Sequence, residues 1–155
     1  MASIESRDEL TEELRRRRLL LFRAAERLCA CDLEVVREIV PVRPVTRLPG
    51  APAWVSGLVN LRGTLVTVVD LPCRFGAEPN RARQIIVVEA CGAVFGIGVD
   101  AVRNVEALAD EAFEPVDAAH TLGGIVSALA NVAADGGGTA LVCDVEAIAR
   151  EALAI

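Results

Sequence analysis

The sequence predicts an all-β domain of the small-barrel type that ends in a helix. Short apolar runs alternate with turn residues about every eight to twelve positions, the spacing of strands in sandwiches and barrels. Hydrophobic residues make up 53% of the 155 residues, but aromatic residues only 3%, and tyrosine is absent. Valine, leucine, isoleucine and alanine must therefore fill the interior, which suits closely packed sheets. The length fits one domain, or two small subdomains that share a core.

Helices are expected at the two ends and at one place between them. Residues 1–17 are charged and carry little periodic pattern, so we expect a tail or a short helix. Asp32 is placed to cap a short helix over Leu33–Ile39, where apolar residues fall near helical spacing. Asp144 is placed to cap a last helix over Val145–Leu153, which has one apolar stripe.

The remaining apolar runs are expected to form strands, because they are rich in aliphatic residues and bounded by turn residues. A hairpin is predicted between Leu19 and Cys31, and Val42–Leu48 is expected to be extended at a sheet edge. Further strands are predicted at Gln84–Glu89, Ala93–Val99, Val102–Leu108, Phe113–Val116, Ile125–Val132 and Thr139–Cys143. Pro72–Arg83 is expected to be a loop and Ala134–Gly138 a turn, while Asp100–Phe113 has a helical alternative.

The most informative segment runs from Leu48 to Leu71. Its two prolines force an extended approach. An apolar stretch then stops at Asn60-Leu61-Arg62-Gly63, and a β-branched run follows that closes at Asp70. This pattern predicts a strand, a tight turn at Gly63 and a second strand, with one cation at the corner. The layout offers neither a nucleophile nor a base, so it indicates binding rather than catalysis.

Two charged residues stand in apolar company and form the candidate functional pair. Glu38 lies within the apolar segment Val36–Val40, and Arg62 follows Leu61. A charge that is buried costs several kcal/mol unless it is paired. We therefore expect Glu38 and Arg62 to pair with each other. The alternative is that both side chains face water, as most arginines and glutamates do.

Composition argues against a nucleic-acid or membrane partner. The formal net charge is −6, whereas nucleic-acid binding requires a basic surface. The one basic run, Arg15–Arg18, follows acidic residues, which predicts local pairing or a solvated tail. The longest nearly apolar stretch, Ala90–Val99, is about half of what a bilayer-spanning helix needs. We expect a cytoplasmic protein that binds no nucleic acid and does not insert into a membrane.

Catalysis and cofactor binding find no support either. The five cysteines lack C-x-x-C spacing, so they are expected to be small buried hydrophobes, with Cys29 and Cys31 on one strand face. Gly96–Ala101 matches the dinucleotide pattern G-x-G-x-x-A, but it lies within a predicted strand, where two glycines on one face would admit another backbone. His120 has no second ligand nearby. We expect no metal, no cofactor and no enzymatic activity.

The order of these motifs resembles the CheW-like domain family, the adaptor modules of bacterial chemosensory arrays. The matching segments run from about Leu19 to the C-terminus. They are Leu20-Leu21-Phe22, Val36-Arg37-Glu38-Ile39, the Pro-x-x-Pro approach, Gly57–Gly63, Val68–Leu71, Arg74-Phe75-Gly76, Ile85–Glu89, Gly98–Val102 and Leu141–Asp144. The resemblance implies that residues 18–155 form two five-stranded β-barrel subdomains with a shared hydrophobic core, preceded by the tail 1–17.

The resemblance also implies a role. Family adaptors dock the regulatory domain of a CheA-type histidine kinase and receive the cytoplasmic tip of a chemoreceptor in a groove between the barrels. Such an adaptor lies in the cytoplasm, at the inner face of the membrane through receptor arrays, and uses no cofactor. The positions tied to partner binding are Val36, Glu38, Gly57 and Arg62, with Val99 and Val102 on the second barrel's side of the groove.

Three departures leave the choice of partner open. Thr67 stands where the family usually has proline, and Pro72-Cys73 replaces an arginine-containing sequence after Asp70-Leu71. The N-terminal extension is longer than the core module requires. The alternative is therefore a divergent adaptor that binds receptors but not the kinase and serves a non-flagellar pathway.

Overall fold

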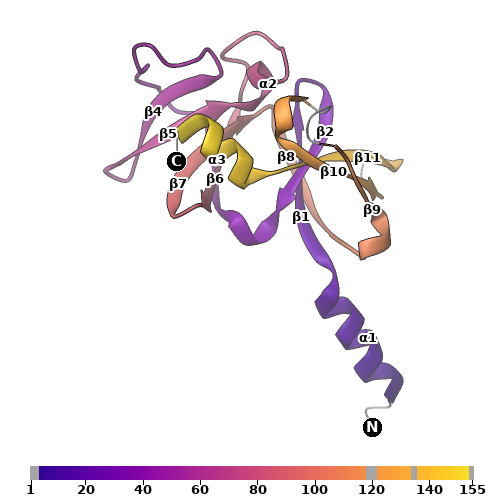
Figure 1. Ribbon diagram of the computed structural model, residues 1–155. Helices are drawn as coiled ribbons and strands as arrows, with labels where there is room; N and C mark the ends of the chain where they lie inside the picture. The colour runs from indigo at the N-terminus through magenta and orange to yellow at the C-terminus, as the bar shows by residue number, and fades with distance from the viewer. Residues whose placement is uncertain (1–3, 118–121, 134–135, 154–155) are drawn as a thin grey trace.

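The computed structural model describes residues 4–117, 122–133 and 136–153, which form two curled β-sheets and short helices. One sheet has six strands, in the order β8 (Ala101–Leu108), β1 (Arg17–Ala24), β2 (Arg27–Asp32), β11 (Gly138–Cys143), β10 (Val126–Val132) and β9 (Phe113–Pro115). The other has five, in the order β3 (Val36–Pro41), β6 (Gln84–Ala90), β7 (Ala93–Val99), β5 (Thr64–Asp70) and β4 (Val55–Leu61). Figure 1 shows the sheets side by side, with the helices α1 (Ile4–Arg15), α2 (Leu71–Arg74) and α3 (Val145–Leu153). The predicted all-β fold with two subdomains is confirmed, and the short strand β9 makes one sheet larger than expected.

Both sheets are built in the same way. In the six-stranded sheet the hairpins β1–β2 and β10–β11 join through their second strands, which run parallel. In the five-stranded sheet the hairpins β6–β7 and β4–β5 join through the parallel strands β5 and β7. Strand β8 flanks β1 as β3 flanks β6, and β9 flanks β10 as Thr46 flanks Leu58 of β4. The two barrels therefore have the same arrangement of strands, in which the hairpin β1–β2 corresponds to β6–β7. The first of these is the first hairpin of its sheet along the chain, and the second is the last hairpin of its sheet.

Strands β1 and β6 are buried on both faces. Along Leu19–Phe22, alternate side chains enter the core of the six-stranded barrel and a core shared by the two barrels. Along Ile85–Val88, they enter the core of the five-stranded barrel and the same shared core. A strand buried on both faces needs a continuous apolar run, which explains the unbroken aliphatic sequence of both segments. Helix α3 adds Val145, Ile148 and Ala149 to the shared core. The expected shared core is confirmed.

The predicted helix over Leu33–Ile39 is wrong beyond its first turn. A 3-10 helix covers Leu33–Val35, and strand β3 follows at once. Asp32 makes no capping bond but accepts hydrogen bonds from Arg17 at 3.0 and 3.1 Å. Pairing with β6 and the β-branched residues of β3 outweigh the near-helical spacing of the apolar positions.

Two other predictions change. The expected loop Pro72–Arg83 begins with α2, whose first turn is capped by the preceding aspartate. The helical alternative for Asp100–Phe113 is wrong, because most of that segment is strand β8, paired with β1. The predicted turn Ala134–Gly138 lies partly outside the described residues. The extended edge segment Val42–Leu48 meets β4 at Thr46.

Gly57 allows this edge segment to close the five-stranded barrel. The backbone N–H groups of Thr46 and Leu58 each donate to the other residue's carbonyl oxygen at 2.8 Å. Gly57 adopts φ +135°, and a Cβ atom there would lie 2.1 Å from the Thr46 carbonyl oxygen. Any side chain at position 57 would therefore push the closing segment away from β4.

Asp70 is the one buried charged side chain among the described residues. Its Oδ1 accepts a hydrogen bond from the Cys73 N–H at 3.2 Å, and its Oδ2 accepts one from the Asn80 N–H at 3.0 Å. It therefore fixes both the start of α2 and the loop that leads into β6. Asp144 caps α3 as predicted, accepting from the Ala147 N–H at 3.1 Å.

The cysteines divide into two groups. Cys29, Cys31 and Cys143 are buried, as predicted, whereas Cys73 is only partly buried and Cys91 is exposed. Cys29 and Cys31 share one face of β2 in the shared core. Burial, with Asp32 and Cys29 nearby, raises the pKa of Cys31 to about 12. The Cys29 thiol and burial raise the pKa of Cys143.

A Gly57→Ala substitution is expected to lower the free energy of unfolding by more than about 2 kcal/mol, because it adds a clash with backbone to an unfavourable φ. Gly63→Ala is the matched control: its φ is +86°, but nothing lies within 4 Å of the added Cβ atom. It should lose only about 1–2 kcal/mol. Urea unfolding followed by Trp54 fluorescence measures both. Equal losses would contradict a steric role for Gly57.

An Asp70→Asn substitution is expected to destabilise the fold by about 1–3 kcal/mol. The amide nitrogen cannot accept a hydrogen bond, so one of the two backbone N–H groups that donate to Asp70 would lose its partner. Asp144→Asn should be nearly neutral, since asparagine caps helices as well as aspartate does. The two urea midpoints, measured side by side, test this difference. A neutral Asp70→Asn variant would show that the carboxylate does not hold the loop.

The raised thiol pKa values predict a loss of stability in alkali. An unfolded thiol has a pKa near 9, below the folded value for Cys31. The stability that the folded protein gains from its protonated thiol is therefore fully present below pH 9, and it declines as the pH rises toward 12. The chain contains no lysine and no tyrosine, so the thiols dominate titration there. The free energy of unfolding should fall by about 1.4 kcal/mol per pH unit for each such thiol. Cys31→Ala should reduce this slope in urea unfolding, and an unchanged slope would contradict the assignment.

Candidate functional site

Glu38 and Arg62 form an ion pair, as predicted. The Nη1 atom of Arg62 lies 2.9 Å from the Oε2 atom of Glu38. Glu38 lies on β3, and Arg62 follows directly after β4. These two strands stand at opposite ends of the strand order of the five-stranded sheet. The ion pair therefore joins the two edges where the sheet curls into a barrel.

The β4–β5 turn presents Arg62 to the solvent. Arg62 and Gly63 have φ values of +52° and +86°, the combination that a two-residue type I′ hairpin turn requires. The side-chain oxygen of Asn60 accepts a hydrogen bond from the Gly63 N–H at 2.8 Å and braces the turn. Arginine in the left-handed region costs about 1–2 kcal/mol. The turn itself therefore gives no reason for an arginine at this position.

The exposure of the pair differs from the expectation. The Arg62 side chain is 80% exposed and that of Glu38 is 29% exposed. The argument that apolar neighbours bury both charges is wrong for Arg62, which faces water and is paired at the same time. An exposed ion pair contributes about 0–1 kcal/mol to stability. A guanidinium that is oriented yet exposed is suited to bind a partner's carboxylate or carbonyl groups.

Val36 and Gly57 belong to the same barrel as the ion pair. Val36 is partly buried against the shared core at the start of β3. The next residue, Arg37, is ion-paired with Glu89 on β6, a contact that the sequence analysis missed. Gly57 is buried on β4 and acts through barrel closure rather than through an exposed surface.

Val99 is not placed as expected, whereas Val102 lies in the other barrel, at the junction between the two. Val99 lies on β7, in the same sheet as Glu38, and its side chain is completely buried in the shared core. It cannot line an open groove in the other barrel. Val102 lies on β8 of the six-stranded sheet and is partly buried. Its N–H donates to the side-chain oxygen of Gln84 on β6 at 2.8 Å, which links the two barrels.

The glycine pattern Gly96–Ala101 does not form a phosphate-binding turn. Gly96 and Gly98 lie inside β7. A Cβ atom at Gly96 would lie 2.7 Å from the Cγ2 atom of Ile85, and one at Gly98 would lie 2.9 Å from the Cβ atom of Ala82. Side chains come closest to both glycines, and the expected approach of another backbone is found at Gly98, where the added Cβ atom would lie 3.3 Å from the carbonyl oxygen of Val69. The motif is part of the strand.

Other chemistry finds no constellation in the part of the chain that the structure describes. No group of three or more His, Cys, Asp or Glu side chains is placed there to hold a metal ion. His120 lies outside the described residues. Within the same described ranges, no helix combines the length and the apolar character needed to cross a membrane.

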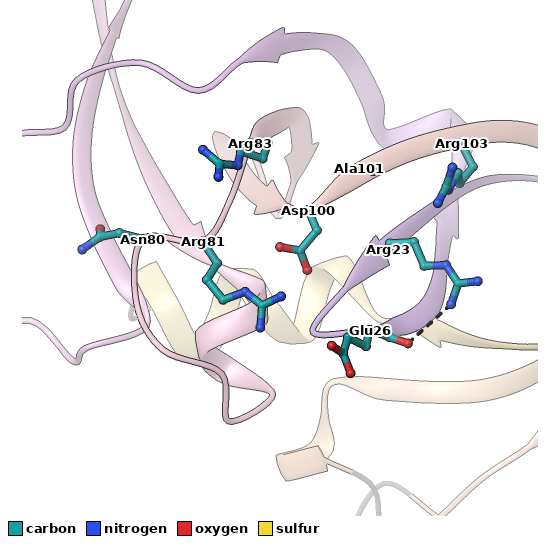
Figure 2. A pocket seen from close by; sticks show the side chains of 8 residues that line it. All are labelled: Arg23, Glu26, Asn80, Arg81, Arg83, Asp100, Ala101 and Arg103. Atoms are coloured by element: carbon teal, nitrogen blue, oxygen red, sulfur yellow. Dashed lines mark hydrogen bonds between the residues drawn. The ribbon is translucent and has the colours of Figure 1, made fainter.

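The sequence analysis also missed a cleft lined by arginines, shown in Figure 2. Its guanidinium groups come from β1, from β8 and from the segment just before β6. No basic run marks it in the sequence. Only the pair Arg81 and Arg83, separated by one residue, gives a local signal.

Comparison with known proteins points to one family. A model of the CheW-like domain matches residues 18–153. The chain is 37% identical over 102 residues to the chemotaxis protein CheW of Rhizobium meliloti, which covers 64% of this chain and 66% of that protein. It is 30% identical over 118 residues to the chemotaxis protein CheW of Klebsiella aerogenes, covering 74% and 71%. The matched region thus spans just under two thirds of the length of the Rhizobium relative.

A solved structure extends the similarity to three dimensions. The crystal structure of the scaffolding protein TtCheW from Thermoanaerobacter tengcongensis superposes with a TM-score of 0.72 at 28% identity. The match covers 83% of this chain and 84% of that protein. Such coverage includes parts of both barrels, and the family model spans them from β1 to α3. The chain therefore belongs to the CheW-like domain family.

Proposed function

We propose that the chain is a non-catalytic adaptor that couples chemoreceptors to a CheA-type histidine kinase in a bacterial chemosensory pathway. Family membership supports this role, since two relatives are named chemotaxis proteins and the structural neighbour is named a scaffolding protein. The observation that carries the proposal is the Glu38–Arg62 pair. It places an oriented and 80% exposed guanidinium on a turn that gains no stability from it.

The proposed mechanism is coupling through a rigid body. The five-stranded barrel presents Arg62, and Val102 lies at the junction with the other barrel. The shared core holds the two barrels in one arrangement. When one rigid body binds both a receptor and a kinase, it holds the two in a fixed arrangement, so that a conformational bias of the receptor alters the kinase through the contacts that they share. The adaptor needs no reacting group for this task.

Partner docking at Arg62 is consistent with its surroundings. Glu38 on β3 lies beside the β4–β5 turn that carries Arg62, because the ion pair joins them, and Val36 lies two residues before Glu38 on the same strand. Gly57 holds the closing segment that keeps the two barrel edges together. We propose that Val36, Glu38 and Arg62 contact the partner and that Gly57 supports them. Val99 is left out, because it is completely buried.

Arg62→Asn separates a binding role from a structural one. Asparagine tolerates the left-handed turn position, so the free energy of unfolding should rise by about 0.5–1 kcal/mol. We expect the same variant to recover at least tenfold less CheA-type kinase and chemoreceptor in a pull-down from the native cell lysate. Quantitative mass spectrometry measures recovery, and urea unfolding measures stability.

Arg150→Asn is the matched control, because Arg150 is exposed on α3 and paired only with Glu146 among the ion pairs of the described residues. Its recovery of partners should equal that of the wild type. Undiminished recovery by Arg62→Asn would contradict a binding role for Arg62. Recovery of receptor without kinase by the wild type would favour the receptor-only adaptor.

A further inference from the structure

The arginine-lined cleft lies between the two barrels. It has a volume of about 630 Å³. Its walls carry four arginines and two acidic residues, namely Arg23, Arg81, Arg83, Arg103, Glu26 and Asp100. In Figure 2 the Arg81 side chain extends toward the middle of the cleft, with Asp100 and Glu26 across from it. The cleft thus has a net charge of +2 in a chain whose formal charge is −6.

Backbone contacts hold both walls of the cleft in place. On the side of the six-stranded barrel, Asp100 accepts a hydrogen bond from the Ala25 N–H at 2.7 Å and donates its own N–H to the Arg23 carbonyl at 2.9 Å. On the other side, the Arg83 N–H donates to the Val99 carbonyl at 2.9 Å. The buried carboxylate of Asp70 fixes the residue before Arg81. The arginines therefore project from fixed backbone.

A fixed cluster of arginines attracts an anionic partner with several charges. Guanidinium groups bind carboxylates through charge-assisted and often bidentate hydrogen bonds. The field of such a cluster also raises the rate at which oppositely charged partners meet. The carboxylates of Glu26 and Asp100 on the same walls oppose a compact polyanion such as a phosphate group. An extended surface with spaced carboxylates fits the mixture better.

Helix α1 has that character. It contains five acidic residues and two arginines, a net charge of −3 over its length. Asp8, Glu9, Glu12 and Glu13 are all exposed, and so is the apolar Leu10, at 60%. Figure 1 shows α1 extending from the start of β1, away from both sheets.

The helix gains little from its own sequence. Asp8 and Glu12, like Glu9 and Glu13, are like charges four residues apart, and each such pair destabilises a helix by about 0.2–0.5 kcal/mol. Isolated helices of about this length are marginal in water. Contact with a basic surface would offset both the like-charge repulsion and the marginal stability of a short helix, so the helix is suited to docking.

The helix does not reach the cleft of its own chain. Arg17, at the start of β1, is fixed by its bonds to Asp32 and by its position 4.4 Å from the Phe113 ring. Arg23 lies at the far end of β1, about 20 Å away at the rise of an extended strand. A helix of this length spans only about 18 Å. Strand β1 is also paired at both edges and buried on both faces, so α1 cannot lie along it.

We propose that α1 of one copy docks in the arginine-lined cleft of a second copy. The acidic residues of the helix meet the guanidinium groups of the cleft, and the contact relieves the like-charge repulsion within the helix. Helix and cleft are different surfaces, so the association is heterologous. Each copy offers one of each and can therefore bind two others. This contact leaves the Glu38–Arg62 pair on the five-stranded barrel untouched.

Sedimentation velocity of the full chain at low and high salt tests the proposal. The wild type should self-associate at low salt, and high salt should weaken the association at least tenfold. A cleft variant with Arg81→Glu and Arg103→Glu, and a helix variant with Asp8→Arg and Glu12→Arg, should each be monomeric. The control Arg150→Glu should behave as the wild type. Trp54 fluorescence and circular dichroism confirm that every variant is folded.

Mixing the two charge-reversed variants gives the decisive measurement. In the mixture the unchanged helix of the cleft variant meets the unchanged cleft of the helix variant, so the mixture should associate although neither variant does so alone. A wild type that stays monomeric at low salt would overturn the proposal. Association that survives both variants, or a mixture that stays monomeric, would overturn it as well. None of these outcomes bears on Arg62, so the adaptor proposal is tested separately.

Discussion

The shared core between the barrels is the constraint on which the rest of the structure depends. Two central strands, β1 and β6, give one face to their own barrel and the other to this common core. Neither barrel can be complete without the other, because Leu20, Phe22, Ile86 and Val88 would then face water. Burial of such side chains is worth about 1.5–3 kcal/mol each. The same core fixes the relative position of surfaces that belong to different barrels, which is what a scaffold requires.

The residues that we propose to bind partners lie outside this core. Arg62 lies at the tip of a hairpin and Arg81 lies in a loop, and neither side chain belongs to the apolar interior. The backbone beneath them is nevertheless fixed, by Asn60 in one case and by the buried Asp70 in the other. A rigid frame with exposed cations lowers the entropic cost of ordering side chains when a partner binds. The proposed binding role would account for an arginine in the left-handed region at position 62.

Sequence reasoning recovered the elements whose signals are local. The segment Asn60–Gly63 predicted the β4–β5 turn, Asp144 predicted the cap of α3, and the aliphatic runs predicted the strands. It also found the Glu38–Arg62 pair, although the inferred burial was wrong for Arg62. It failed where pairing with a distant segment decides the secondary structure. The prediction of a helix over most of β3 was wrong, because pairing with β6 makes this segment a strand. The burial of Val99 and the arginine-lined cleft also arise only when distant segments meet.

The matching topology of the two barrels has a consequence for the order of folding. All five strands of one sheet, β3 to β7, are contiguous in the chain, so this barrel can close once residue 99 has been made. The other sheet joins β1 and β2 to β8 and β11, and its last strand ends at Cys143. The first hairpin must therefore wait, with its apolar faces uncovered, while an entire barrel is synthesised. Such non-local pairing slows folding and exposes strand edges. During synthesis, the N-terminal hairpin is the part of this chain most in need of protection by a chaperone.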